Sequence, residues 1–309
     1  MNRLLVFALM VLAVAAASGG GVGGRAPTTG APAAEPPEIK AEATVSTETG
    51  VVYATWEGRT LTLDIHAPAD PEDAPVVVYL PGRCEHSVPF KLLDGLIENG
   101  AIVFVVPYAA SSYQPKTILA EGSADVRAMA DSLACAMHMV RDRAARFGSA
   151  DPVVVLTGFS MGGAPAAHAA LFGSDLERRW EEFATEGGPP RQVVCEVATG
   201  STHVDALVGV AGAYDMLVPA FEGGYGREYQ QARNFEQWQF LASAVGLNPD
   251  LEIRLIHGTK DSIIAFENAT EFAEVMGEAG YDVQLIGFEG GHWVESELTL
   301  SIIVGLIGR

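Results

Sequence analysis

The sequence predicts an α/β fold, in which helices cover both faces of an open, mostly parallel sheet. From Ala74 onward, continuous apolar runs alternate with stretches whose apolar residues recur every three or four positions. Strands separated by helices in this way form parallel units that are buried on both faces. One such strand, residues 152–159, runs through Gly-Phe-Ser-Met-Gly-Gly into an alanine-rich helix at residues 164–171. With 309 residues, 49% of them hydrophobic, the chain is long enough to bury a core.

The N-terminal residues have the pattern of a secretory signal peptide. Arg3 supplies a positive charge, and residues 4–17 form an apolar run too short to span a bilayer comfortably. Small residues allow cleavage near Ala17, so we expect a secreted or periplasmic protein, with an uncleaved N-terminal anchor as the alternative. Residues 18–42, rich in Gly, Ala and Pro, are expected to be a disordered spacer. Residues 43–309 then form one folded domain.

The first half of this domain begins with an antiparallel pair of strands around a turn at residues 57–59. Apolar Leu61, Leu63 and Ile65 alternate with polar neighbours, as expected for a strand with one face in solvent. The apolar pattern then predicts strands at 75–80 and 101–108 and helices at 90–99 and 124–147, the last ended by Gly148.

In the second half, residues 173–200 look polar and irregular apart from a helical segment at 176–184. Further strands are predicted at 204–212, 251–257 and 283–288, and helices at 267–278 and 296–307. Residues 216–249 carry several aromatic side chains without clear periodicity. We interpret them as a small lid-like insertion over the sheet edge.

Charge and cysteine content restrict the partners. The formal net charge of −20 argues against nucleic acid and anionic membrane surfaces, both of which require a basic surface. No cysteine or histidine spacing indicates a metal site, so we expect none. The three cysteines allow three disulfide pairings in an oxidising compartment. We favour Cys135 with Cys195, because Cys84 lies in a loop for which another role is expected below.

The segment Gly158-Phe-Ser160-Met-Gly162 has the pattern of a nucleophile elbow. In this motif a serine occupies a strained strand-to-helix turn, and the two glycines allow strand and helix to pass closely. The alternative interpretation is an ordinary glycine-rich turn without a reactive serine. Residues elsewhere in the sequence therefore have to distinguish a nucleophile elbow from an ordinary turn.

A serine hydroxyl is a weak nucleophile near neutral pH and needs a base that is itself oriented by a third group. Asp261 and His292 supply these groups in the order Ser, Asp, His, and each lies just past the end of a predicted strand. Open parallel sheets gather their sites at these strand ends. His257 is the main rival base, and Asp215 is the fallback acid. The remaining histidines lie outside this order: His66, His86, His138, His168 and His203.

The chemistry of such a serine also requires N–H donors for the negative charge that develops on the attacked oxygen. One donor is the backbone N–H of Met161, the residue after the serine. The other is expected in the loop after the first parallel strand, from the amides of Arg83 or Cys84, where Gly82 permits a sharp turn. The alternative for this loop is a plain strand exit.

Together these residues resemble the α/β-hydrolase superfamily, and within it secreted esterases of the carboxylesterase and feruloyl-esterase type. The resemblance rests on the lead-in strand at 61–68, the passage 125–163, His-Gly-Thr-Lys-Asp at 257–261 and Gly-Gly-His-Trp at 290–293. It implies hydrolysis of small-molecule or polymer-linked carboxylic esters by a serine esterase without a cofactor. Ser160 would be the nucleophile, His292 the base and Asp261 its partner.

Two departures and two alternatives accompany this resemblance. Many relatives carry His-Gly-Gly-Gly where this chain has Pro81-Gly82-Arg83-Cys84, and the elbow has Phe159 before its serine. A peptidase of the prolyl-oligopeptidase type shares the same three residues, although it usually brings a propeller domain for which this chain offers no room. The other alternative is a non-catalytic binding protein on the same fold, which usually loses one of the three residues.

Overall fold

The computed structural model describes residues 45–82, 87–109, 123–186, 190–214 and 246–308. Residues Glu42–Arg309 form one unit, and the second unit, Met1–Ala41, falls wholly outside the described ranges. The expected signal peptide and spacer therefore lie outside the described residues, as do positions 216–245 of the lid-like insertion. Residues 246–249 form turns ahead of the following strand.

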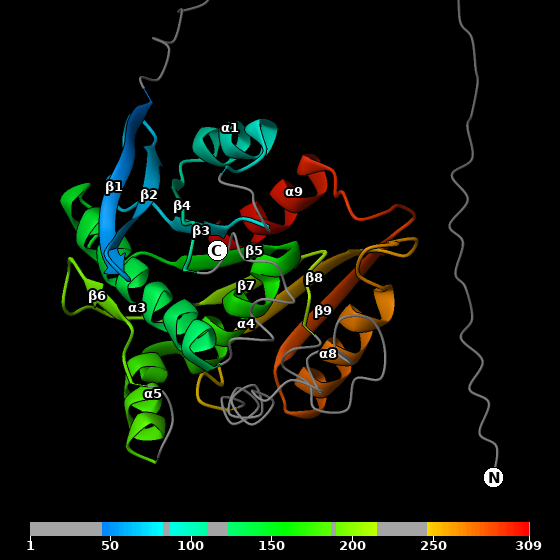
Figure 1. Cartoon of the computed structure of the whole chain (residues 1–309). Helices are drawn as coiled ribbons and strands as arrows, with labels where there is room; N and C mark the ends of the chain where they lie inside the picture. The colour runs from blue at the N-terminus through cyan, green and yellow to red at the C-terminus, as the bar shows by residue number, and fades with distance from the viewer. Residues whose placement is uncertain (1–44, 83–86, 110–122, 187–189, 215–245, 309) are drawn as a thin grey trace, which may run out of the picture. The chain divides into compact units, whose positions relative to one another are not determined.

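A single sheet of nine strands runs through the described residues, and Figure 1 shows its course. One half of it is antiparallel: β6 pairs with β1, β1 with β2, and β2 with β4. From β4 onward every pair is parallel, through β3, β5, β7, β8 and β9. The predicted mostly parallel α/β sheet with an antiparallel lead-in is thus confirmed. In spatial order the strands are β6 (Val193–Cys195), β1 (Ser46–Trp56), β2 (Arg59–Ala67), β4 (Ile102–Val105), β3 (Val76–Leu80), β5 (Val154–Phe159), β7 (Ala206–Val210), β8 (Glu252–Gly258) and β9 (Asp282–Phe288).

Helices cover both faces of this sheet, as predicted. On one face α1 (Phe90–Glu98) and α9 (Ser296–Ile307) pack against each other, and α9 also packs on β5 and β7 (Figure 1). On the other lie α3 (Ser123–Arg146), α4 (Gly163–Phe172) and α8 (Phe266–Glu278), with α5 (Leu176–Thr185) against α3 and α4. None of the helices in the described ranges has the length and apolar character needed to cross a bilayer.

The buried core accordingly has two layers, one on each side of the sheet. Alternate residues of a central strand enter different layers: in β3, Val78 and Leu80 join the layer under α3 and α4, while Val77 and Tyr79 join the layer under α1 and α9. This alternation follows from the period of two along a strand. It determines which side chains at the strand ends lie on the α1–α9 side.

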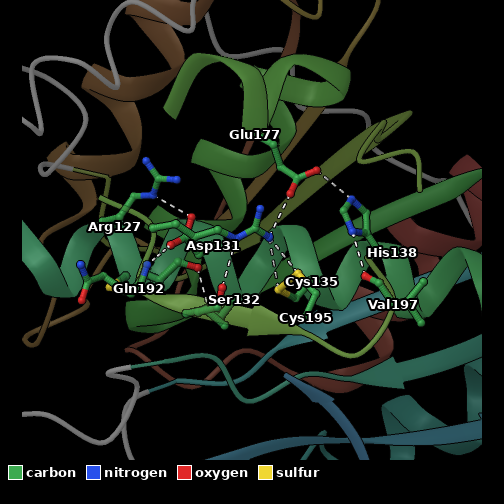
Figure 2. Close-up of a disulfide and its surroundings, with 12 residues drawn as sticks. Arg127, Asp131, Ser132, Cys135, His138, Glu177, Gln192, Cys195 and Val197 are labelled. Carbon is green, nitrogen blue, oxygen red and sulfur yellow. Dashed lines mark hydrogen bonds and ion pairs between the residues drawn. A yellow bond between two sulfur atoms is a disulfide. The ribbon is translucent and has the colours of Figure 1, made fainter. Parts of the chain in front are cut away.

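One prediction is wrong in the segment taken as irregular. Residues Val193–Cys195 form the short edge strand β6, whose Cys195 lies opposite Ala54 of β1. The strand is held by a disulfide to the fully buried Cys135 of α3, which is the pairing that the sequence favoured (Figure 2). Three residues are too few for an alternating pattern, and this edge strand is held both by its pairing with β1 and by the disulfide.

Candidate active site

The elbow forms where β5 meets the helix that follows it. Phe159 ends the strand, Ser160–Gly162 make one turn of 3-10 helix, and α4 continues directly. Ser160 has a φ of 52°, in the left-handed region that is strained for a side chain other than glycine. The Ala213 N–H donates to the Ser160 carbonyl at 3.1 Å and helps to hold this geometry. The serine is half-buried at the carboxyl end of the sheet.

The two elbow glycines are required by close packing. A Cβ at Gly158 would overlap the Gly162 carbonyl oxygen and the Ala166 methyl group. A Cβ at Gly162 would overlap the carbonyl oxygens of Leu80 and Pro81 at the end of β3. Strand, turn and neighbouring strand therefore meet with no room for a side chain, and this contact fixes where Ser160 stands.

A continuous line of hydrogen bonds joins the three residues predicted from the sequence. His292, between β9 and α9, places Nε2 2.9 Å from Ser160 Oγ and Nδ1 2.7 Å from Asp261 Oδ2. An ionised carboxylate can only accept, so Nδ1 carries the proton and donates to Asp261. Nε2 is then free to accept the proton of the Ser160 hydroxyl. This is the tautomer that a general base requires.

Asp261 is held in its ionised form at the start of the loop after β8. Its side chain is 0% exposed, and Oδ1 accepts the N–H groups of Ile263 at 2.8 Å and Ile264 at 2.9 Å. Burial opposes ionisation, but these backbone donors and the His292 hydrogen bond outweigh it and hold the pKa of Asp261 below its ordinary value of 3.8. The carboxylate is therefore ready to stabilise a positive imidazole ring.

His257, the rival base, takes a different place in the structure. Its Nε2–H donates to the Ile264 carbonyl at 2.9 Å and lies 3.3 Å from Asp261 Oδ2. Burial lowers the pKa of His257, so the ring is neutral at neutral pH. The side chain thus ties the strand end to the loop that presents Asp261. In the sequence, the position of His257 four residues before Asp261 was the feature that could have indicated this structural role.

The oxyanion donors are described only in part. Met161 is the second residue of the 3-10 turn, and the first amides of such a turn have no acceptor within the helix. Its role as one oxyanion donor stays a prediction. The predicted second donors, Arg83 and Cys84, lie outside the described residues, as does the fallback acid Asp215.

Two aromatic side chains to which the sequence analysis gave no role in the site flank the His292 ring. The ring centroids of Phe159 and Trp293 lie 5.4 Å and 5.9 Å from that of His292, and 5.5 Å from each other. Phe159 directly precedes the serine and Trp293 directly follows the histidine. Their position next to the serine and the histidine in the sequence could have indicated that they lie at the site.

One group of described residues brings together side chains of the metal-ligating kind. His138, Glu177 and Cys195 place ligand atoms within 4.8 Å of one another beside the disulfide (Figure 2). The Cys195 sulfur is bonded to Cys135, so it is not a thiolate. Glu177 pairs with His138 at 3.0 Å and with Arg191 at 3.1 Å, and its hydrogen bond with His138 lowers the pKa of the carboxyl. Glu177 therefore already has two partners in His138 and Arg191, and the sulfur belongs to a disulfide.

Neither a protein-family model nor a curated protein matches the chain, but many solved structures do. A truncated carbohydrate esterase from gut microbiota is 20% identical, with a TM-score of 0.61, over 87% of this chain and 99% of that one. Butyrate-bound esterase 2 of Thermogutta terrifontis is 20% identical, with a TM-score of 0.54, over 83% of this chain and 93% of that one.

A bifunctional GH43-CE protein of Bacteroides eggerthii is also similar, at 19% identity and a TM-score of 0.53. The match covers 80% of this chain and 36% of that longer protein. At these identities the likeness establishes the fold. The chain has the α/β-hydrolase fold, as the sequence resemblance implied.

Proposed function

We propose that the protein is a serine esterase that hydrolyses carboxylic esters through an acyl-enzyme intermediate. The observation that carries this proposal is the line of hydrogen bonds from Ser160 through His292 to the buried carboxylate of Asp261. It combines a strained serine, a base in the required tautomer and an ionised partner for that base, all at the carboxyl ends of parallel strands.

In the first half of the reaction the Ser160 oxygen attacks the ester carbonyl carbon while His292 Nε2 takes the hydroxyl proton. The carbonyl oxygen becomes negative and accepts a hydrogen bond from the Met161 N–H. It accepts a second one from a backbone N–H that we assign to Arg83 or Cys84. The bond from carbon to the alcohol oxygen then breaks, and His292 gives its proton to that oxygen. Asp261 stabilises the imidazolium that forms between these transfers.

In the second half, water replaces the alcohol beside His292. His292 takes a proton from the water while the water oxygen attacks the acyl carbon. It then gives this proton to Ser160 Oγ as the bond between the acyl carbon and that oxygen breaks. The carboxylic acid leaves and the enzyme is restored. Besides the ester and this water, the proposed reaction uses only the residues named.

The named activities of the similar structures agree with this chemistry. They include esterases from gut microbiota and Thermogutta terrifontis, the latter also solved phosphonylated by cyclosarin. The two alternative functions use the same residues differently. A peptidase would cleave amides, and a non-catalytic binding protein would turn over neither amides nor esters.

The decisive experiment is substitution of the nucleophile. Ser160→Ala should abolish hydrolysis of p-nitrophenyl acetate and butyrate while the circular dichroism spectrum and melting temperature stay near wild type. Ser301→Ala, on the exposed side of α9, is the matched control and should keep full activity. Undiminished turnover by the Ser160→Ala protein would rule out the mechanism.

Two further assays separate the alternatives. A fluorophosphonate probe should label the wild-type protein and not the Ser160→Ala variant, whereas a binding protein would remain unlabelled. Turnover of an amide should be far slower than that of the ester with the same acyl group. Comparable rates on both would favour a peptidase.

We further propose that residues 1–17 direct secretion or export to the periplasm. The Cys135–Cys195 disulfide supports this proposal, because such bonds persist in oxidising compartments. Sequencing the N-terminus of the protein recovered from a secreting host should give a start just after Ala17. A retained first residue would favour the uncleaved anchor.

A further inference from the structure

A cavity of about 420 Å³ lies beside the triad, on the side of the sheet covered by α1 and α9. Its floor is formed by Tyr79, Phe159 and Val210, which come from the adjacent strands β3, β5 and β7. Its walls come from the start of α1 and from the segment that joins His292 to α9, the two helices that pack together on this face (Figure 1). The cavity is thus bounded by parts of the chain that the fold brings together at the ends of the strands.

Two of the lining residues connect this cavity to the reacting atoms. Phe159 precedes the nucleophile and Trp293 follows the base, and both rings contact the His292 ring at centroid distances of 5.4 Å and 5.9 Å. An occupant of the cavity therefore lies next to the imidazole. In the proposed reaction His292 gives its proton to the oxygen of the departing alcohol, so the alcohol portion of the ester has to lie on this side.

The lining indicates the chemical class of that portion. Among the residues that the structure describes, none that lines the cavity is charged. Aromatic Tyr79, Phe159 and Trp293 are accompanied there by aliphatic side chains and a few hydroxyls. A charged group or a densely hydroxylated sugar ring would lose hydrogen bonds to water that these side chains do not replace. An aromatic ring instead gains apolar burial and favourable ring–ring contacts.

Size and exposure agree with a ring-bearing group. An engineered cavity of about 150 Å³ is enough to hold benzene, so the space here exceeds what an ethyl group would fill. Trp293 is 69% exposed although it packs on Phe159 at the cavity, which leaves one broad apolar surface open to an incoming ligand.

We propose that this cavity is the binding site for the alcohol portion of the substrate and that it selects esters of uncharged alcohols carrying an aromatic ring. The assignment rests on the proposed esterase function, and it adds the class of substrate. Trp293 and Val294 line the site where the chain leaves the triad, so they are the positions at which its size can be changed.

Two ester series test the proposal. The alcohol series compares ethyl, cyclohexylmethyl and benzyl acetate, and the acyl series compares the methyl esters of acetic, 3-cyclohexylpropanoic and 3-phenylpropanoic acid. Benzyl acetate should exceed ethyl acetate in kcat/KM by about 10-fold or more, the discrimination expected when an apolar group fills a pocket. It should also exceed the cyclohexylmethyl ester. An aromatic preference confined to the acyl series, or none at all, would overturn the proposal.

Variants locate the preference in the cavity. Val294→Trp should fill it and reduce the benzyl-to-ethyl ratio to below about 3-fold, while ethyl acetate is still hydrolysed. The control Val275→Trp, on the exposed face of α8 and outside the cavity, should keep the wild-type ratio. If Val294→Trp does not fold, Trp293→Ala, which shortens an exposed side chain, should lower the same ratio. A ratio unchanged in the folded pocket variants would refute the assignment.

A binding measurement separates failure of the cavity from failure of the esterase function. Benzyl alcohol should bind to the wild-type and Val275→Trp proteins in ligand-observed NMR, and binding should be lost in a folded Val294→Trp or Trp293→Ala protein. Esterase activity without this binding would refute the cavity proposal alone. Binding without hydrolysis of any ester would refute the proposed function on which the substrate assignment rests.

Discussion

Removing the disulfide between α3 and β6 should lower the stability of the protein by a predictable amount. The bond joins residues 60 apart in sequence. Closing a loop of that length in the unfolded chain removes about 14 cal/mol/K of entropy, or about 4 kcal/mol at 25 °C. At roughly 2 °C per kcal/mol for a domain of this size, the melting temperature should fall by ~8 °C.

The experiment uses the double variant Cys135→Ala, Cys195→Ser in urea unfolding followed by circular dichroism. The free energy of unfolding should fall by about 4 kcal/mol, and wild type in excess reductant should fall by a similar amount. Cys84→Ser is the control, because it leaves the pair intact, and should retain the wild-type unfolding midpoint. A double variant that also unfolds at the wild-type midpoint would show that the bond does not stabilise the fold.

The same variant should keep its activity at 25 °C wherever it remains folded. In the sheet, β6 is separated from β5 by the four strands β1, β2, β4 and β3. At about 4.8 Å between neighbours, the disulfide strand lies ~24 Å from the strand that carries the serine. A fall of more than twofold in kcat/KM in the folded variant would contradict this separation of stability from catalysis.

Substitutions at three further positions test the triad, the loop that carries Asp261 and the elbow helix. Asp261→Asn should lower kcat for p-nitrophenyl butyrate by on the order of 10³- to 10⁴-fold with little change in KM, because the amide no longer stabilises the imidazolium; a loss below tenfold would contradict that role. His257→Leu should lower kcat about tenfold by removing the Nε2–H donor to the loop of Asp261, whereas His257→Gln, which can still donate, should recover part of it; equal activity in both variants would exclude positioning. Burial lowers the pKa of His168 from 6.5 to about 3. Below pH 6.5 this histidine is therefore protonated in the unfolded chain but stays neutral in the folded chain. Stability should therefore fall between pH 6.5 and 4.5 by about 2 kcal/mol through this residue. His168→Gln, which keeps an acceptor for the Trp180 indole N–H, should lose that component; equal pH dependence in urea unfolding would refute it.

The parts of the fold that the sequence predicted well are those coded by a local pattern. The elbow could be predicted because β5 is a continuous apolar run that leads into Gly-Phe-Ser-Met-Gly, and the contacts that require Gly158 lie within a few residues. Asp261 and His292 could be predicted because the ends of parallel strands converge, so their position after a strand already places them on one edge of the sheet.

Other features depend on contacts that a local pattern does not contain. β6 is three residues long and is fixed by a disulfide to a distant helix. The predicted strand 204–212 is shorter in the structure, because Ala211 adopts a φ of 46° directly after Val210. The cavity could not be predicted either, since its lining comes from strands and helices that only the folded sheet brings together.

The close contact of the elbow with β3 has a consequence for engineering this protein. At positions 158 and 162 any side chain would push against backbone, so random mutagenesis there should yield mostly insoluble protein. Phe159, in the same turn, instead directs its ring to the cavity and the base. A library that keeps both glycines and varies Phe159 together with Val294 would therefore sample changes in substrate specificity, and few of its variants should fail to fold.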